Sequence, residues 1–138
     1  MAHEMHAPGE LGASTRTDEG QGWLAFAAVM LLIAATFNAV YGIAALANDD
    51  YFAADELLFG DLSMWGVVYL AFSAAQLAAA LLIISRRPSG AILGIGLVGL
   101  HAIAALMSIG AYPLWSVILL VVDGLIIYGL SVYGFGEE

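Results

Sequence analysis

Four polar side chains that can do chemistry stand alone in four long apolar stretches of this 138-residue chain: Asn38, Gln76, His101 and Asp123. Asp123 is the only formally charged residue within these stretches. A carboxylate in hydrocarbon costs at least a few kcal/mol, so Asp123 needs a polar partner. Imidazole and amide groups both donate and accept hydrogen bonds. We therefore expect an interhelical polar cluster inside a membrane.

The depth of two of these residues follows from their spacing around a tight turn. His101 and Asp123 are each eleven residues from Tyr112. At about 1.5 Å per residue, both lie about 16 Å from that turn, close to the bilayer midplane. Helices joined by so short a turn are antiparallel neighbours, so the two side chains share one depth. Asn38 is expected slightly outward of the midplane, and Gln76 slightly inward.

Three interpretations of the cluster stay open. In the first, the polar residues hold helices together through hydrogen bonds that contribute roughly 0.6–2 kcal/mol each. In the second, His101 and Asp123 form a proton relay or a polar-ligand site, because ionisable residues inside membranes often mark pathways. In the third, Asp123 faces a partner subunit and meets a charge there.

Sequence patterns of catalytic sites and cofactors are absent. The chain has no cysteine, which excludes thiol catalysis and Cys-based metal sites. No metalloprotease, phosphate-loop or nucleophile-elbow motif is present. The glycines of segment 94–99 match dinucleotide-binding spacing but lie inside an apolar span, so packing is the better interpretation. We predict no catalytic residue, no metal, no cofactor and no enzyme activity.

The elements that position these residues follow from the distribution of charge. Hydrophobic residues make up 62% of the chain and charged residues 11%. A helix needs roughly 20 apolar residues to cross a bilayer. The uncharged runs and the break at Pro113 then predict an all-α membrane protein with four transmembrane helices in two antiparallel hairpins. The expected spans are about 23–47, 62–84, 90–110 and 113–134.

The arginines predict the orientation. Arg16 precedes the first span, and Arg86 and Arg87 join the second to the third. Basic residues near membrane spans prefer the cytoplasmic side. With four spans, one orientation places all three arginines on that side. Both termini are then cytoplasmic in the inner membrane. Within a transmembrane domain over 23–134, this makes 48–61 an external loop and 85–89 a cytoplasmic one. Residues 1–22 are expected to form a mobile tail, and 135–138 a short second one.

Small residues predict where the helices pack. Gly90, Gly94 and Ala105 share one face of the third span with His101, and small residues at such spacing let helices approach closely. Gly42 in the first span and Gly66 in the second belong to similar stripes. His101 is therefore expected on a packing face rather than toward lipid.

The net charge of −9 comes almost wholly from the tails and one loop. It argues against nucleic acid and against anionic lipid headgroups as partners of the exposed parts. Membrane lipids and other membrane protein subunits are the expected partners, and a homo-oligomer is also compatible with the sequence.

Two unusual strings carry a resemblance to a known family. They are Phe-Asn-Ala-Val-Tyr-Gly at 37–42 and Tyr-Pro-Leu-Trp-Ser at 112–116. With Asp50-Tyr51-Phe52 and Asp61-Leu62-Ser63-Met64-Trp65-Gly66, the chain resembles, over about 20–134, a family of short actinobacterial membrane proteins of unassigned function. The resemblance implies a four-helix protein of the cytoplasmic membrane and carries no activity.

The small size, the little chain outside the spans and the lack of a catalytic motif favour a non-enzymatic membrane protein. We expect an accessory or scaffolding subunit of a larger membrane complex, for example a lipid-transport or respiratory assembly. The alternative is a small transporter or sensor that uses the His101/Asp123 pair for a proton or a polar ligand.

Overall fold

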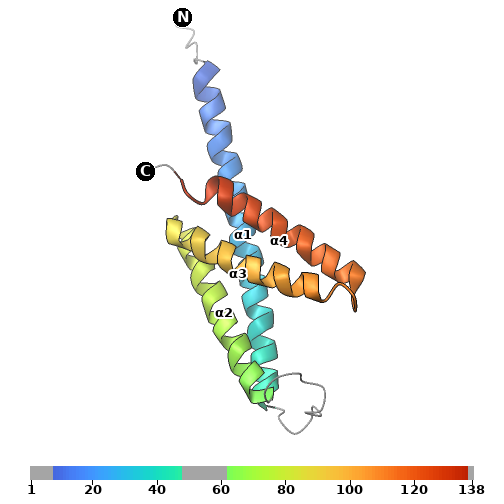
Figure 1. The fold of residues 1–138 in the computed structure, drawn as a ribbon. Coiled ribbons are helices and arrows are strands. Elements are labelled where there is room, and N and C mark those ends of the chain that lie inside the picture. Colours follow the sequence, from blue (N-terminus) through green and yellow to red (C-terminus); the bar gives the residue numbers. More distant parts are fainter. Residues whose placement is uncertain (1–7, 48–61, 137–138) are drawn as a thin grey trace, which may run out of the picture.

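Two antiparallel helical hairpins make up the described chain (Figure 1). The structure is a computed structural model that describes residues 8–47 and 62–136. The first hairpin consists of α1 (Pro8–Ala47) and α2 (Leu62–Ile84), and the second of α3 (Pro88–Met107) and α4 (Pro113–Tyr133). The described residues contain no strand. The predicted fold class, all-helical with four helices of membrane-spanning length, is confirmed.

The helix α1 begins well before the first predicted span. It starts at Pro8, so residues 8–22, which were expected to belong to a mobile tail, are helical in the structure. Proline suits the first helical position because its fixed φ is already helical. The membrane-length part of α1 also provides the costly helix nucleus, and adding further turns to an existing helix is cheap. Residues 1–7 and the predicted external loop 48–61 lie outside the described residues.

The bounds of the other helices follow the sequence closely. α2 has the predicted bounds, whereas α3 ends at Met107, before the expected position 110. The backbone N–H of Tyr112 donates to the carbonyl of Ser108 at 3.0 Å, which closes the turn. Tyr112 itself is non-helical, with φ −135° and ψ 65°. Proline disfavours a helical conformation in the residue before it, so Pro113 both ends the turn and opens α4.

All four helices share a core at only one end of the molecule. It is formed by the first half of the membrane part of α1, the last half of α2, the first half of α3 and the last half of α4. Its most buried side chains are Ala27, Leu31, Ala79, Ala80, Ala91 and Leu130. Leu31 and Leu130 are the largest fully buried apolar side chains, and they anchor the two hairpins to each other.

Beyond this shared core the hairpins diverge. Figure 1 shows the α3–α4 hairpin crossing α1 obliquely, so that its turn points away from the far end of the α1–α2 hairpin. α1 and α2 stay in contact from the shared core to the Gly42–Gly66 contact, and α3 and α4 stay in contact as far as the His101–Asp123 pair. The two hairpins therefore meet at the shared core and point in different directions beyond it.

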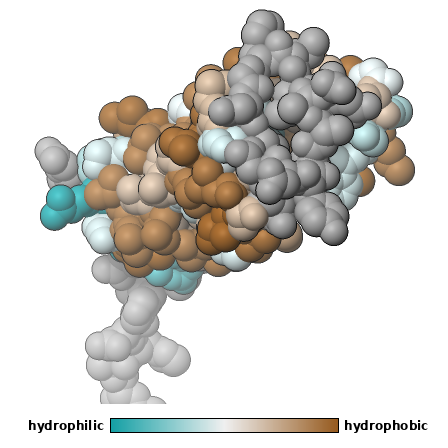
Figure 2. All heavy atoms as spheres, turned by 90° about the horizontal axis from the view of Figure 1, so that it is seen from below, coloured by the Kyte–Doolittle hydropathy of each residue, from teal (hydrophilic) through white to brown (hydrophobic). Residues whose placement is uncertain are grey.

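The helices leave most of their apolar surface uncovered. Within the apolar windows of the four helices, between 22% and 33% of residues are buried inside the protein. Hydrophobic residues cover most of the described surface in Figure 2, and the strongly hydrophilic ones lie at its edges. Such a surface has to be covered by lipid or by another protein. The chain is thus a multi-pass membrane protein.

The α2–α3 turn and the end of α4 lie beside the part of α1 around Gly20 and Leu24, where its most apolar part begins. The ring of Tyr133 packs against Gly20, where an added Cβ would lie 2.9 Å from it. One small pocket is lined both by Arg86 of the turn and by Leu24 of α1. This arrangement is the one that four membrane crossings require.

Candidate functional site

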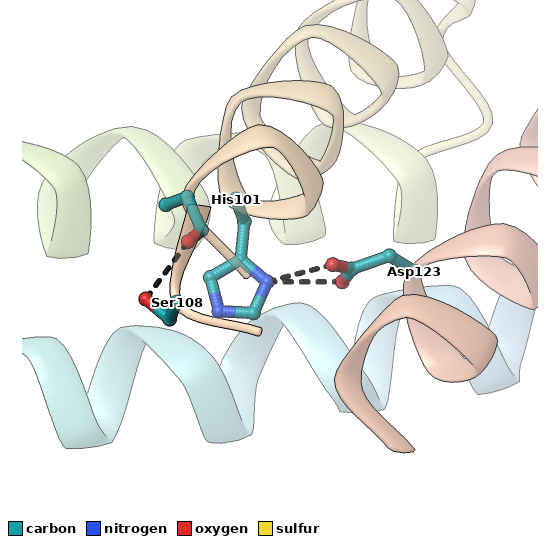
Figure 3. A network of polar contacts seen from close by, with 4 residues as sticks. His101, Ser108 and Asp123 are labelled. Carbon is teal, nitrogen blue, oxygen red and sulfur yellow. Dashed lines mark hydrogen bonds and ion pairs between the residues drawn. The ribbon is translucent and has the colours of Figure 1, made fainter. Parts of the chain in front are cut away.

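A hydrogen-bonded His101–Asp123 pair joins α3 to α4 (Figure 3). The His101 Nδ1 atom lies 2.8 Å from the Asp123 Oδ2 atom and 3.1 Å from Oδ1. An ionised carboxylate only accepts hydrogen bonds, so the Nδ1–H of the imidazole donates to it. Asp123 thereby has the partner that its burial in an apolar span demands.

The tight α3–α4 turn places the two residues at one depth. Only residues 108–112 separate the end of α3 from Pro113, the first residue of α4. The chain therefore has no slack that would let one helix slide along the other. Equal spacing from Tyr112 then puts His101 and Asp123 opposite each other, as their spacing in the sequence predicts.

The two partners differ strongly in exposure. The Asp123 side chain is 6% exposed and that of His101 is 46% exposed. The imidazole thus contacts the carboxylate through Nδ1 (Figure 3), while nearly half of its side chain stays uncovered. His101 thus lies at the α3–α4 packing face, as expected, but α1 and α2 diverge from α3 at this level and leave part of its side chain uncovered.

An open groove of about 440 Å³ begins at this exposed edge. It is lined by one face of α3, by the turn and by the start of α4: His101, Ala104, Ala105, Ser108, Tyr112, Trp115, Ser116 and Leu119. The Ser108 hydroxyl donates to the carbonyl of Ala104 at 3.0 Å, so it is engaged within its own helix. The free imidazole edge and the Tyr112 phenol give the groove hydrogen-bonding capacity among apolar walls.

The other two predicted polar residues form a second pair in the other hairpin. The Asn38 Nδ2 atom donates to the Gln76 Oε1 atom at 2.8 Å, joining α1 to α2. One turn away, the Ser73 hydroxyl donates to the carbonyl of Ala35 at 2.8 Å. This hydrogen bond joins the two amide side chains directly, although no short turn fixes the register of this hairpin.

The four polar residues are thus two pairs rather than one cluster. Within the described residues, no hydrogen bond links the Asn38–Gln76 pair to the His101–Asp123 pair. No group of three potential metal-ligating His, Cys, Asp or Glu side chains forms in this part of the chain. Each hairpin carries its own interhelical polar contact.

The small residues singled out for packing lie at close helix contacts. At Gly42 and Gly66 the backbones of α1 and α2 approach so closely that a Cβ on either would lie 2.9–3.0 Å from the other's carbonyl oxygen. A Cβ on Gly90 would lie 2.6 Å from the backbone nitrogen of Ile83, and one on Gly94 would lie 2.8 Å from Leu130. Ala105 is 5% exposed.

Sequence reasoning missed that Tyr112 and Trp115 belong to the groove. It used Tyr112 only to locate the tight turn. Trp115, Leu119 and Asp123 follow one another at four-residue spacing, which places them on one face of α4. That spacing was the available signal, since it continues the face of Asp123 toward the turn.

Comparison with known proteins identifies a family but no characterised relative. No curated protein and no solved structure matches the chain. A family described as a domain of unknown function, DUF7144, matches residues 23–135, which include all four apolar spans and both polar pairs. The chain therefore belongs to the DUF7144 family of proteins of unassigned function.

Proposed function

We propose that this protein is a non-enzymatic accessory subunit of a larger membrane complex, and that it docks through the His101 face of the α3–α4 hairpin. The observation that carries the proposal is the exposed edge of the imidazole. A polar group that faces lipid pays for its lost hydrogen bonds with water, whereas a partner helix can supply a hydrogen bond in their place.

Two further features support the proposal. The groove beside His101 offers a concave surface with Tyr112 and Trp115, residue types that are enriched at protein interfaces. At most a third of each apolar window is covered by the chain itself, which leaves wide helix faces for a neighbour. The proposal includes that both termini are cytoplasmic, that the protein lies in the inner membrane and that it comes from an actinobacterium.

The test uses site-specific photo-crosslinking in native membranes, followed by native electrophoresis in mild detergent. A photoreactive residue at Ala104, in the groove, is expected to crosslink to a defined protein partner. The matched control is Ile103, which is 58% exposed and lies on the opposite side of α3 at the same depth. It is expected to crosslink to lipid.

The proposal also requires that formation of this complex depends on the exposed imidazole of His101. His101→Ala is expected to lower its yield, whereas Ile103→Ala leaves it unchanged. Migration of the wild-type chain as a lone monomer in several mild detergents, with no protein crosslink from Ala104, would contradict the proposal.

A second candidate function rests on the same groove. Its volume of about 440 Å³ and its polar members would suit a proton pathway or a small polar ligand in a transporter or sensor. Asp123→Asn would then abolish a pH-dependent flux or signal in reconstituted vesicles without loss of folding. If Asp123→Asn only lowers stability, this second candidate is excluded.

A further inference from the structure

A second pocket lies at the other end of the molecule, where the shared core meets the water boundary. It has a volume of about 230 Å³ and is bounded by the α2–α3 turn, the start of α3, the end of α4 and α1. Its apolar part is formed by Leu24, Ile83 and Ala91, and its polar part by Arg86, Arg87 and Tyr133. The pocket is thus apolar toward the membrane and basic toward water.

The two arginines are the basic residues nearest to the spans. α2 ends at Ile84, so Arg86 and Arg87 follow directly after a membrane-spanning segment, at the level of lipid headgroups. Within the described residues neither guanidinium forms an ion pair; the ion pair found there is His101–Asp123. The positive charges of Arg86 and Arg87 are therefore not neutralised by an acidic side chain of the described residues and can pair with an external anion.

The backbone of the turn is strained in a way that keeps both arginines at the pocket. The N–H of Arg86 donates to Ile83 and that of Arg87 donates to Leu82, each at 2.9 Å, which is the hydrogen-bond pattern of a Schellman helix end. Glycine usually occupies the position of Arg86, because its φ is positive, here 55°. An arginine in this conformation costs stability, which points to a role for its side chain.

The start of α3 adds to the positive potential. Helix N-termini carry partial positive charge and exposed N–H groups. Arg87 is the N-cap residue of α3, and no side chain caps this helix. The pocket therefore combines two guanidinium groups with the positive end of a 20-residue helix. Phosphate is the anion that such a combination binds well.

We propose that this pocket binds the phosphate group of an anionic membrane phospholipid, with the lipid chains leaving along the apolar side. Arginine pairs with phosphate through two parallel hydrogen bonds, and basic pockets at the cytoplasmic ends of transmembrane helices bind such headgroups. The volume is below the roughly 300–1,000 Å³ of pockets that enclose whole small molecules, as expected for one headgroup.

The net charge of −9 opposes a general attraction of anionic lipid, so the proposed site depends on the local charge of the turn. Asp18 and Glu19 of α1 lie toward the same end, and Glu137 and Glu138 follow the pocket residue Gly136 in the sequence. An anionic lipid is thus attracted only where Arg86 and Arg87 meet the start of α3.

The test measures lipid selectivity by electron paramagnetic resonance of the full chain in phosphatidylcholine vesicles. The probes are spin-labelled phosphatidylglycerol and spin-labelled phosphatidylcholine, and the readout is the fraction of each that the protein immobilises. The wild type is expected to prefer phosphatidylglycerol. R86G and R87Q are each expected to lower this preference about fivefold, the value for one basic residue near a membrane surface.

Two controls separate the pocket from general charge and from misfolding. R16Q removes the remaining basic residue, which lies outside the pocket, and is expected to keep the preference. R86G places the residue that this backbone conformation favours, so it is expected to melt no lower than the wild type.

Three results would overturn the inference. The wild type could show no preference for phosphatidylglycerol, or R16Q could lose it as much as R86G does. Inorganic phosphate could displace the labelled phosphatidylglycerol, which would indicate a site for the free ion.

Discussion

At the scale of single residues, the His101–Asp123 contact replaces the water that a carboxylate would otherwise need. Both carboxylate oxygens lie within hydrogen-bonding distance of one imidazole nitrogen, at 2.8 and 3.1 Å. Hydrocarbon offers no substitute donor, so removal of either partner leaves a polar group unpaired. Such contacts between transmembrane helices nevertheless contribute modestly, because the unfolded chain in a membrane also finds partners.

A double-mutant cycle with His101→Ala and Asp123→Ala should give a coupling free energy of about 0.6–1.7 kcal/mol, the range for interhelical hydrogen bonds in membranes. Unfolding of the purified protein by sodium dodecyl sulfate measures it. Asp123→Asn keeps an oxygen that can accept from Nδ1, so it should lower stability less than Asp123→Ala. A coupling energy of zero would show that the pair does not form in the membrane.

The two polar pairs should contribute independently. Asn38 and Gln76 share no partner with His101 and Asp123. Effects of such separate sites usually add within about 0.5 kcal/mol. Asn38→Ala combined with His101→Ala is therefore expected to lower the free energy of unfolding by the sum of the two single effects. A deviation well beyond that limit, in the same detergent titration, would mean that the pairs communicate.

At the scale of helices, the close α1–α2 contact depends on glycine. A methyl group on Gly66 would lie 2.9 Å from a carbon of Leu46 and 3.0 Å from the Gly42 carbonyl oxygen. The backbone oxygen cannot move aside as a flexible side chain would. The approach of the two helices is therefore limited by the backbone itself.

Gly66→Ala is expected to destabilise the protein by about 1–3 kcal/mol, the usual cost of overpacking a tight contact. Gly96→Ala is the matched control, because no atom lies within 4 Å of the added methyl group. It should be neutral or stabilising by up to about 1 kcal/mol, since alanine favours a helix over glycine. Equal losses for both variants would contradict the close approach at Gly66.

The position of α2 to α4 could be predicted from the sequence because charge and proline mark their limits. Arg86 ends the apolar run of α2, and Pro113 separates α3 from α4. The extension of α1 to Pro8 could not be predicted, since residues 8–22 have no apolar periodicity. Their helix continues an existing one and does not depend on packing of its own.

The candidate site was predictable only in part, and the reason is the length of the loops. A tight turn fixes how α3 and α4 pair, so the depths of His101 and Asp123 could be counted from Tyr112. The α1–α2 connection is longer, and the pairing of Asn38 with Gln76 could not be counted in the same way. The exposure of His101 depends on how the hairpins diverge, which no local pattern encodes.

At the scale of the whole molecule, one shared core holds two self-contained hairpins together. Leu130 is fully buried there and packs against the glycine face of α3 at Gly94. The contacts within each hairpin continue beyond the core, to Gly42 and Gly66 in one and to His101 and Asp123 in the other. The junction between the hairpins should therefore be weaker than either hairpin.

Leu130→Ala should lower the stability of this junction by about 2–5 kcal/mol, the cost of truncating a buried leucine. Fluorescence of Trp65, in α2, and of Trp115, in α4, can follow the hairpins separately in variants that keep one of these tryptophans. The two detergent-unfolding curves should coincide in the wild-type background and separate in Leu130→Ala. Curves that stay coincident at lower stability would indicate a single cooperative bundle.

The presence of one polar pair in each hairpin also bears on how the chain enters the membrane during synthesis. Helices leave the ribosome in order, and α1 and α2 are complete before α3 and α4 are made. Because Asn38 pairs with Gln76, the first hairpin can pass from the insertion machinery into lipid with its amide groups satisfied. Asp123 arrives last and finds His101 already in place on the preceding helix. Each hairpin thus contains both partners of its polar pair, so neither pair depends on the other hairpin for its hydrogen bond.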